Sequence, residues 1–308
     1  MWKTDLKNNL KCSLLEEGKE LAPLSALGAG GRGELFVEPT ELRDISELFR
    51  IRSGENFPLY ILGGGTNVVF ADGDLEGVVL STRRLKGWRW DIDGTNAVLE
   101  AETGCLLPRV VSYTSKEGFT GAEFAYGIPG TVGGAVAGNA GTGGESVGDL
   151  LEEVTTVEER GDVRKWGRGE FGYSYRHFSL FSSFPPVRFL ASCKMKFRRG
   201  SPFEIERKIE LFRRTRSSQP RDAKSAGCAF KNPPGDSAGR LLDVSGCKGL
   251  CVGGAVVSEL HANFVLNGNN ATGADIFRLM ESCRDIVFQK TGVRLEPEVK
   301  LLGFETGL

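Results

Sequence analysis

The segment from Gly127 to Gly144 constrains this chain most, because it reads GIPGTVGGAVAGNAGTGG and carries no charged side chain. Eight of its residues are glycine, and glycine in this density costs conformational entropy on folding. Since the remaining side chains are small, the main chain itself is the surface that the segment offers. Its N–H groups suit a phosphate-bearing cofactor, and a flat ligand can lie close to such a backbone. The segment taken alone is equally compatible with a tight crossover in a glycine-rich fold.

The bulk composition is that of an ordinary globular protein. With 308 residues and 40% hydrophobic content, the chain can build two or three folding units, or one large one, with ample core. Its 39 basic and 40 acidic residues give a net charge of −1, without the basic excess of a nucleic-acid-binding protein. No apolar run reaches the roughly 18 residues of a membrane span, and the first residues lack the apolar core of a signal peptide. We therefore expect a cytoplasmic protein without nucleic-acid binding or membrane insertion.

The cysteines do not predict a metal site. They number seven, are scattered, and include no C-x-x-C pair, while His177 and His261 are the only histidines. Zinc and iron–sulfur spacings are therefore absent, and reduced thiols in a reducing compartment are expected. We predict no bound metal.

A second glycine-rich turn follows an apolar strand expected at residues 59–62 and reads GGGTN, from Gly63 to Asn67. A strand that enters a glycine turn with a following hydroxyl and amide suits a phosphate cradle. It is not a Walker loop, because no Lys-Ser/Thr pair follows the glycines.

Three earlier glycines, Gly28, Gly30 and Gly33, match the dinucleotide spacing G-x-G-x-x-G. The segment before them contains Pro23 and the segment after them, ELFVEP, is typical of a strand where the fingerprint requires a helix. We interpret this match as a glycine turn.

The pattern of apolar residues predicts mixed helices and strands, and so the α+β class. Thr40 is expected to cap a helix, and Thr272 another that ends near Lys290. Further helices are expected at 108–116, 203–218 and 238–244, and a hairpin at 154–166 around Gly161-Asp162. Strands are expected at 77–81, 88–92, 97–101, 187–197, 252–257, 261–267 and 293–304, the last of them broken by Pro297. A domain boundary is expected near residue 200.

Two residues suggest chemistry by their surroundings. Arg176 lies among aromatics in FGYSYRHFSLF, where a partly desolvated guanidinium could pair with a carboxylate or a developing enolate; cation–π packing is the alternative. Cys228 precedes Lys231-Asn232-Pro233, and a thiol with a reference pKa of about 8.5 can give up a proton. An inert buried cysteine is the alternative.

Glu296 and Glu298 are two residues apart on the last expected strand, so they would share one face. An apolar flank could raise a carboxyl pKa toward that of a general acid, whereas a solvated strand face is the alternative. His261, beside Ala262-Asn263, is a candidate base or a polar edge residue.

Taken in order, GGGTN, GIPGTVGGAVAGNAG, YSYRHFSLF, GCAFKNP, HANFVLN and LEPEV resemble the UDP-N-acetylenolpyruvoylglucosamine reductase family, also called UDP-N-acetylmuramate dehydrogenases. The resemblance covers about residues 20 to 304. It implies a two-subdomain FAD-binding fold of the vanillyl-alcohol-oxidase type, followed by a C-terminal α+β substrate-binding domain. The implied domains are 1–84 and 85–200 for FAD and 201–308 for the UDP-sugar.

The resemblance also implies roles for single residues. The catalytic residues would be Arg176, Glu298 and Cys228, the last standing where many members carry a proton-donating serine. The substrate-binding residues would be Tyr175, Lys231, Asn232 and His261. The FAD-binding residues would be Gly63, Gly64, Gly65, Thr66, Asn67, Gly127, Ile128, Pro129, Gly130, Thr131, Gly133, Gly134, Asn139 and Gly141.

The implied reaction uses NADPH to reduce FAD, which then reduces the enolpyruvyl ether of a UDP-sugar in peptidoglycan precursor synthesis. We expect a monomer. No tyrosine follows Arg176 and only FSSFPP precedes the next strand, which resembles the subclass that lacks a tyrosine-bearing loop over the substrate. The alternatives are another FAD-linked oxidase or dehydrogenase of the same fold acting on an alcohol or sugar, and a catalytically silent flavin-binding protein.

Overall fold

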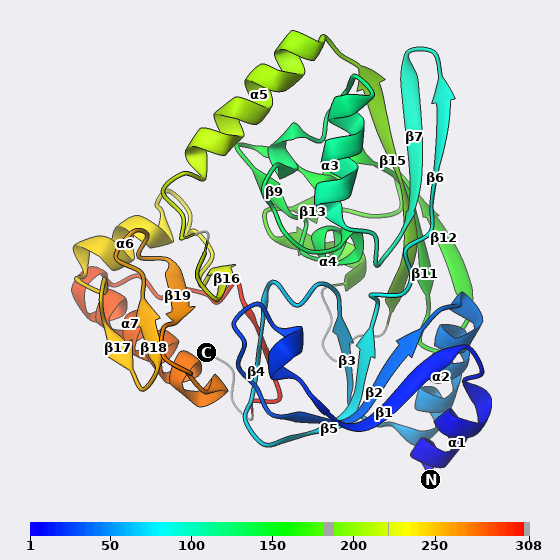
Figure 1. Ribbon diagram of the computed structural model, residues 1–308, viewed down its shortest axis with the longest axis horizontal. Helices are drawn as coiled ribbons and strands as arrows, with labels where there is room; N and C mark the ends of the chain where they lie inside the picture. Colours follow the sequence, from blue (N-terminus) through cyan, green and yellow to red (C-terminus); the bar gives the residue numbers. More distant parts are fainter. Residues whose placement is uncertain (182–187, 221, 305–308) are drawn as a thin grey trace. The chain divides into compact units, whose positions relative to one another are not determined.

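The computed structural model describes residues 1–181, 188–220 and 222–304, which fold as two compact units (Figure 1). Unit 1 comprises Met1–Glu17, Leu35–Gly64 and Gly77–Arg216; unit 2 comprises Gly18–Glu34, Gly65–Glu76 and Ser217–Leu308. The expected boundary near residue 200 therefore differs from the division by compactness, because helix α5 (Pro202–Thr215) groups with unit 1. The three-domain assignment concerns ligand roles and stays a prediction.

A six-stranded antiparallel sheet forms much of unit 1. Its order is β12 (Val163–Gly167), β11 (Leu151–Val157), β15 (Phe189–Arg199), β7 (Asn96–Glu102) and β6 (Trp88–Asp93), with β8 (Phe119–Thr120) also paired to β15. Burial alternates along β7, as expected when one face of a sheet covers a core. The buried face packs with side chains of α3 (Leu107–Lys116) and α4 (Val132–Ala137). The predicted hairpin is confirmed as β11–β12.

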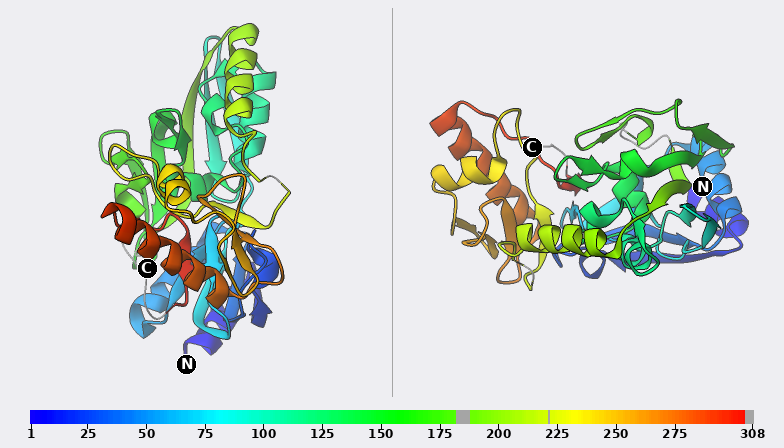
Figure 2. Two further views of the ribbon diagram at one scale, coloured as in Figure 1. Left: turned by 90° about the vertical axis from the view of Figure 1, so that its left-hand side faces the viewer. Right: turned by 90° about the horizontal axis from the view of Figure 1, so that it is seen from above.

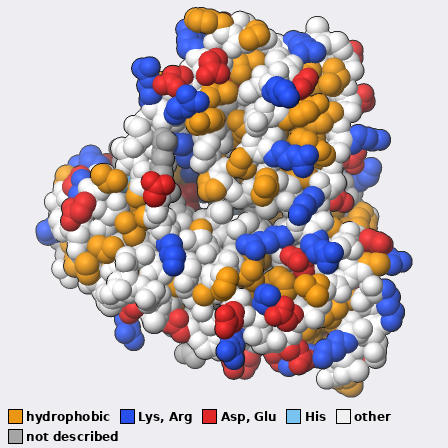
Figure 3. All heavy atoms as spheres, viewed as in Figure 1, with side chains coloured by type: hydrophobic (Ala, Val, Ile, Leu, Met, Phe, Trp, Pro, Cys, Tyr) orange, Lys and Arg blue, Asp and Glu red, His pale blue; other side chains and the backbone are white. Residues whose placement is uncertain are grey.

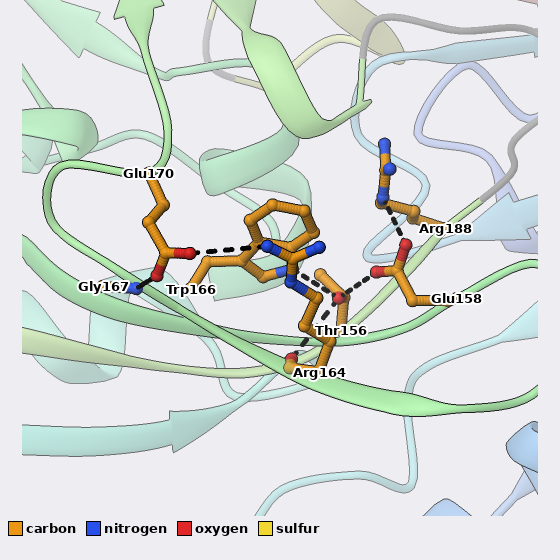
Figure 4. A network of polar contacts seen from close by, with 7 residues as sticks. All are labelled: Thr156, Glu158, Arg164, Trp166, Gly167, Glu170 and Arg188. Atoms are coloured by element: carbon orange, nitrogen blue, oxygen red, sulfur yellow. Dashed lines mark hydrogen bonds and ion pairs between the residues drawn. The ribbon is translucent and has the colours of Figure 1, made fainter.

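The edge of this sheet carries a polar network (Figure 4). The buried Trp166 donates its indole N–H to Thr156 Oγ1 at 2.8 Å, and the Arg164 guanidinium lies 3.4 Å from the ring centroid. Glu158 accepts from Arg188 Nε at 2.7 Å. These groups lie on β11 and β12 or directly beside β11 and β15, and they satisfy one another, so the network helps to hold the sheet edge.

A four-stranded sheet runs in the order β1 (Ser13–Glu20), β2 (Arg32–Pro39), β5 (Asp74–Ser81) and β3 (Leu59–Leu62), with β3 parallel to β5. The predictions missed β1, since its sequence SLLEEGKE has no clear period. The cap expected at Thr40 is wrong: α2 (Leu42–Glu55) has Glu41 at its N-cap. Thr40 instead donates its hydroxyl to Cys12 O at 2.8 Å. Helix α1 (Trp2–Asn9) shares a hydrophobic core with α2.

Unit 2 contains a four-stranded antiparallel sheet in the order β16 (Ser225–Cys228), β19 (Phe264–Asn267), β18 (Ala255–Val257) and β17 (Cys251–Val252). The strand expected at 252–257 is instead the β17–β18 hairpin, because Gly253-Gly254 forms its turn. Helix α7 (Gly273–Thr291) lies beside this sheet in Figures 1 and 2, and α6 (Ala238–Val244) contributes to the same core.

The cap predicted for α7 is confirmed. Thr272 Oγ1 accepts from Asp275 N at 3.1 Å, and the Asp275 carboxylate accepts from Thr272 N at 3.1 Å. This reciprocal capping box satisfies donors that the first turn leaves unpaired. Gly292, with φ +73°, ends the helix in the left-handed conformation that glycine adopts readily.

The end of the chain corrects a further expectation. Strand β20 (Lys300–Leu302) pairs in parallel with β4 (Val68–Phe70), both in unit 2. Glu296 and Glu298 precede β20 and flank Pro297, which forms an isolated bridge with Phe230. They are therefore not part of a regular strand, because proline has no N–H to donate to a ladder.

The remaining elements are short. They are η1 (Ala22–Leu24), η2 (Glu123–Ala125), β9 (Gly141–Thr142), β10 (Glu145–Ser146), η3 (Val147–Leu150), β13 (Tyr173–Ser174), β14 (His177–Phe178) and η4 (Ser179–Phe181). Figure 3 shows basic and acidic side chains interspersed on the displayed face, in keeping with the net charge of −1. Among the described residues, no helix has the length and apolar character to cross a membrane.

Candidate active site

The two glycine-rich segments meet in unit 1. A Cβ atom on Gly64 would lie 2.8 Å from Gly130 Cα, and one on Gly63 would lie 2.7 Å from Thr131 Oγ1. Gly130 has φ +102°, a conformation that side-chain-bearing residues rarely adopt. Main chain therefore packs directly on main chain, which only glycine permits here. The structure thus brings together two segments, separated by more than sixty residues, that the sequence assigned to one cofactor.

Helix α4 is fixed behind this contact. Thr131 caps it by accepting from Gly134 N at 3.3 Å, and Gly133 N donates to Thr103 O at 2.8 Å. A Cβ on Gly133 would lie only 1.8 Å from Thr103 Oγ1. The N–H groups of Gly133 and Gly134 are thus used within the protein. These two glycines serve the close packing of α4.

The second half of GGGTN belongs to unit 2. Gly65 has φ +72° and accepts from Ala26 N at 2.9 Å, while a Cβ there would lie 1.8 Å from Leu24 O. The Asn67 amide donates to Glu298 O at 3.1 Å, and Asn67 O accepts from Lys300 N at 3.0 Å. Asn67, expected at the cofactor, thereby holds the main chain of a predicted catalytic residue.

Arg176 lies in a tight turn of unit 1. Ser174 of β13 pairs with His177 of β14, so Tyr175 and Arg176 are the two central residues of the hairpin turn. Arg176 has φ +53°, which is uncommon for a residue other than glycine. Its Nη1 donates to Gly141 O at 3.3 Å, and its guanidinium lies 5.0 Å from the centroid of the Tyr175 ring, whose residue is 54% exposed. The cation–π contact and the link to the glycine-rich segment are therefore both present.

Asn139, also predicted to bind the cofactor, has its side chain inside the protein. It is 3% exposed, donates from Nδ2 to Ser174 O at 2.8 Å, and accepts at Oδ1 from Gly148 N at 2.9 Å. The amide thus connects the glycine-rich segment with the hairpin that carries Arg176.

In unit 2, three motif segments are joined by hydrogen bonds. The buried Asn263 side chain accepts from Phe230 N at 2.9 Å and donates to Phe230 O at 2.8 Å. Glu298 N donates to Ala229 O at 2.8 Å, and Lys231 N donates to Glu296 O at 2.8 Å. GCAFKNP, HANF and LEPEV therefore form one cluster, although about seventy residues separate the first from the last.

Cys228 ends β16 in this cluster and is a half-buried cysteine that forms no disulfide with another described residue. Gly227, with φ +79°, precedes it at an irregular register between Ser225 and Cys228. Other cysteines are different: burial raises the pKa of Cys105 to about 11 and that of Cys193 to about 12. Those two thiols stay protonated and packed, whereas Cys228 has partial access to solvent.

The two carboxylates near the chain end have different environments. Glu296 is 75% exposed at its side chain and pairs with Lys231 Nζ at 3.3 Å. Glu298 is half-buried. Desolvation and the charge of Lys231 lower the pKa of Lys300, while Glu298 opposes that shift. Glu298 therefore stands next to a cationic pair and is the better shielded of the two carboxylates.

His261 and Asn232 both have structural contacts. His261 Nδ1 accepts from Asn263 N at 3.2 Å, and burial lowers the pKa of the imidazole, so it is neutral at pH 7. Asn232 Oδ1 accepts from Ala238 N at 3.0 Å at the start of α6. These contacts thus order Asn232 and His261 within unit 2 without any ligand.

Sequence reasoning missed three residues near these segments. Arg83 Nη2 lies 3.5 Å from Gly64 O, and Arg216 Nη2 donates to Thr142 Oγ1 at 2.8 Å. Asn263 was named only as a neighbour of His261. Nothing in the local sequence distinguishes these residues, since their contacts arise from chain segments far apart.

Metal ligation has no support in the ranges 1–181, 188–220 and 222–304, where no group of three or more His, Cys, Asp or Glu side chains could hold an ion. The connection expected after Arg176 is short, and its residues 182–186 lie outside the described residues. Membership of the subclass without a tyrosine-bearing loop therefore stays a prediction.

Comparison with known proteins gives two family matches. Residues 33–167 match an FAD binding domain, and residues 219–302 match the UDP-N-acetylenolpyruvoylglucosamine reductase C-terminal domain. The predicted α+β class with an FAD-binding domain is thereby confirmed.

Relatives extend the similarity to nearly the whole chain. A UDP-N-acetylenolpyruvoylglucosamine reductase of Synechococcus sp. (strain WH7803) is 36% identical over 96% of this chain and 95% of its own length. A second, from Symbiobacterium thermophilum, is 38% identical over 89% of this chain and 87% of its own. The crystal structure of the reductase from Thermus caldophilus superposes with a TM-score of 0.78 at 31% identity, covering 94% of this chain and 98% of that one.

Proposed function

Because this chain belongs to the UDP-N-acetylenolpyruvoylglucosamine reductase family, we propose that it reduces the enolpyruvyl ether of UDP-N-acetylglucosamine enolpyruvate to UDP-N-acetylmuramate, with NADPH as electron donor. It is an FAD-containing oxidoreductase of peptidoglycan synthesis. The structural observation that carries the proposal is the hydrogen-bonded cluster of GCAFKNP, HANF and LEPEV. In this cluster, main-chain hydrogen bonds link the segment that carries Cys228 and Lys231 to the segment that carries Glu298.

FAD would be held on the meeting point of the two glycine-rich segments. A pyrophosphate needs N–H donors and positive charge. The loop at Gly63-Gly64 and the segment from Gly127 to Thr131 offer closely approaching main chain, and Arg83 lies beside Gly64. These groups fit the cofactor chemically. We assign Gly133 and Gly134 to the support of this surface, because their N–H groups are used internally. The Asn139 amide is engaged with Ser174 and Gly148 instead.

When bound, FAD supplies the hydride that it has received from NADPH. The chain's part is positioning and electrostatics. Hydride addition to C3 of the enolpyruvyl group leaves negative charge on the substrate as an enolate. Arg176 and Glu298 are the groups proposed to hold that enolate, with the guanidinium stabilising its charge.

Cys228 would complete the reaction by protonating C2 of the enolate. Its thiol is a stronger acid than the serine hydroxyl found in many members, and it is half-buried, so proton donation stays feasible. Lys231 and Asn232 would bind the UDP-sugar with Tyr175 and His261. Lys231 suits a phosphate because it is cationic and is held by the main chain of Glu296.

A spectroscopic titration tests the proposal. The purified protein should be yellow, its flavin absorbance should be bleached by NADPH under anaerobic conditions, and UDP-N-acetylglucosamine enolpyruvate should restore it. Restoration by oxygen but not by the UDP-sugar would favour another FAD-linked oxidase. A colourless protein that takes up no FAD would overturn both enzyme assignments.

The finer properties are proposals as well. We propose a cytoplasmic monomer of the subclass without the tyrosine loop, without nucleic-acid partners. NADPH preference over NADH is checked by comparing the rates of flavin bleaching, and the monomer by sedimentation of the FAD-loaded protein.

A further inference from the structure

The turn that carries Arg176 is poorly stabilised by its own hairpin. Strands β13 and β14 contribute only two residue pairs, and hairpins of this size are marginal in isolation. Arg176 itself has φ +53°, a conformation that persists in a non-glycine residue only where the surroundings impose it. The position of the guanidinium therefore depends on contacts from outside the hairpin.

Asn139 supplies such a contact at the residue before the turn. Its Nδ2 donates to Ser174 O at 2.8 Å, and its Oδ1 accepts from Gly148 N at 2.9 Å, so the amide spans two separate segments of main chain. Asn139 is 3% exposed and has φ +40°. A buried amide with both ends engaged is costly to disturb, because any change leaves a main-chain group unpaired.

The same segment also holds the guanidinium. Gly141, two residues after Asn139, accepts from Arg176 Nη1 at 3.3 Å. A neighbouring contact limits the hairpin further, since a Cβ on Gly148 would lie 2.4 Å from the Tyr173 ring. Residues 139–141 thus fix both the backbone before the turn and the side chain at its tip.

We propose that Asn139 is a positioning residue for Arg176, which sets the guanidinium for the enolate by clamping Ser174. This inference rests on the proposed role of Arg176. It assigns the asparagine of the glycine-rich segment to the second half-reaction, the oxidation of reduced enzyme by the UDP-sugar. FAD affinity and flavin reduction by NADPH should depend on it little.

Asn139→Asp is the sharpest variant. The carboxylate keeps an acceptor for Gly148 N but turns an oxygen toward Ser174 O, so the clamp becomes repulsive. Asn139→Gly, which tolerates φ +40°, is a second variant if the first folds poorly. Asn96→Asp is the matched control, because it makes the same chemical change elsewhere in unit 1. Among the described hydrogen bonds, the side-chain amide of Asn96 contacts only the neighbouring Thr95.

The experiment measures, on the FAD-loaded full chain, the FAD Kd, the rate of bleaching by NADPH and the rate of reoxidation by UDP-N-acetylglucosamine enolpyruvate. We expect Asn139→Asp to slow reoxidation at least tenfold, with Kd and bleaching within about threefold of the parent. In the Arg176→Ala variant, the additional substitution Asn139→Asp should slow reoxidation little further, because both substitutions disrupt the same interaction.

Two results would overturn the inference. A parallel loss of FAD affinity and of both rates would place Asn139 in the cofactor site, and rate losses that multiply in the double variant would make it independent of Arg176. Failure of the parent protein to be reoxidised by the UDP-sugar would instead refute the proposed function, so the two failures are distinguishable.

Discussion

At the scale of single residues, Arg176 offers the most direct test of the chemistry. Arg176→Ala removes a charged donor proposed to act on the developing enolate, and such donors are typically worth about 3–4 kcal/mol of barrier. We therefore expect turnover to fall by roughly 10²- to 10³-fold while FAD stays bound. Steady-state kinetics and flavin absorbance measure the two effects. His177→Ala, exposed on the same hairpin, is the control, and full activity of Arg176→Ala would contradict the assignment.

Cys228 tests the source of the proton. Cys228→Ser should remain active, because a hydroxyl occupies this place in many members of the family. Cys228→Ala should still let NADPH bleach the flavin but should stop formation of UDP-N-acetylmuramate. Product analysis by chromatography separates these outcomes, with Cys251→Ala, an exposed thiol, as the control. Normal product formation by Cys228→Ala would mean that the proton comes from another group.

Residue types suggested candidate chemistry, but they did not predict the contacts that the side chains make. Arg176, Cys228 and Glu298 were singled out from the sequence by their charge or acidity. Asn67 and Asn139 were assigned to FAD because they lie in glycine-rich motifs, yet their amides hold Glu298 and the Arg176 hairpin. An amide side chain has donors and acceptors for either role, so only its partners decide between them.

At the scale of elements, α4 gives a matched pair of glycine variants. Gly133→Ala would place a Cβ 1.8 Å from Thr103 Oγ1, whereas the Cβ of Gly134→Ala would make an ordinary 3.6 Å contact. We expect Gly133→Ala to destabilise the protein strongly. Gly134→Ala should be neutral or stabilising by up to about 1 kcal/mol, since alanine favours helix. Urea unfolding of the FAD-free protein measures both, and equal stability of the two variants would contradict this packing.

Periodicity and turn chemistry predicted most elements. The apolar run at 59–62 is β3, and Thr272 predicted the start of α7 because a side-chain cap is a local signal. The failures were non-local. Thr40 is a good cap by propensity, but its hydroxyl binds Cys12 O, and the segment 252–257 folds back at Gly253-Gly254 into a hairpin.

At the scale of the whole molecule, protection of amides from exchange by each ligand tests which parts of the chain bind FAD and which bind the UDP-sugar. FAD should slow amide exchange at residues 63–64 and 127–131 of unit 1. The UDP-sugar should slow it at 228–232 and 261–263 of unit 2. A ligand that binds only the folded state stabilises it. Hydrogen–deuterium exchange with each ligand in turn measures this, with β12 as an internal control. Protection of 228–232 by FAD alone would contradict the division.

The sequence by itself determined the family, and with it the FAD cofactor and the class of reaction, because six motifs in one order resemble that family. The reacting groups stay a prediction. Only the tertiary structure decided that Gly64 packs on Gly130, that the Asn263 side chain binds the main chain of Phe230, and that Asn139 reaches Ser174. These contacts join segments far apart in the chain, so no local pattern encodes them. The sequence of the Gly127–Gly144 segment predicts a main-chain surface for a flat ligand. In the folded protein it is also the support on which the Arg176 hairpin rests.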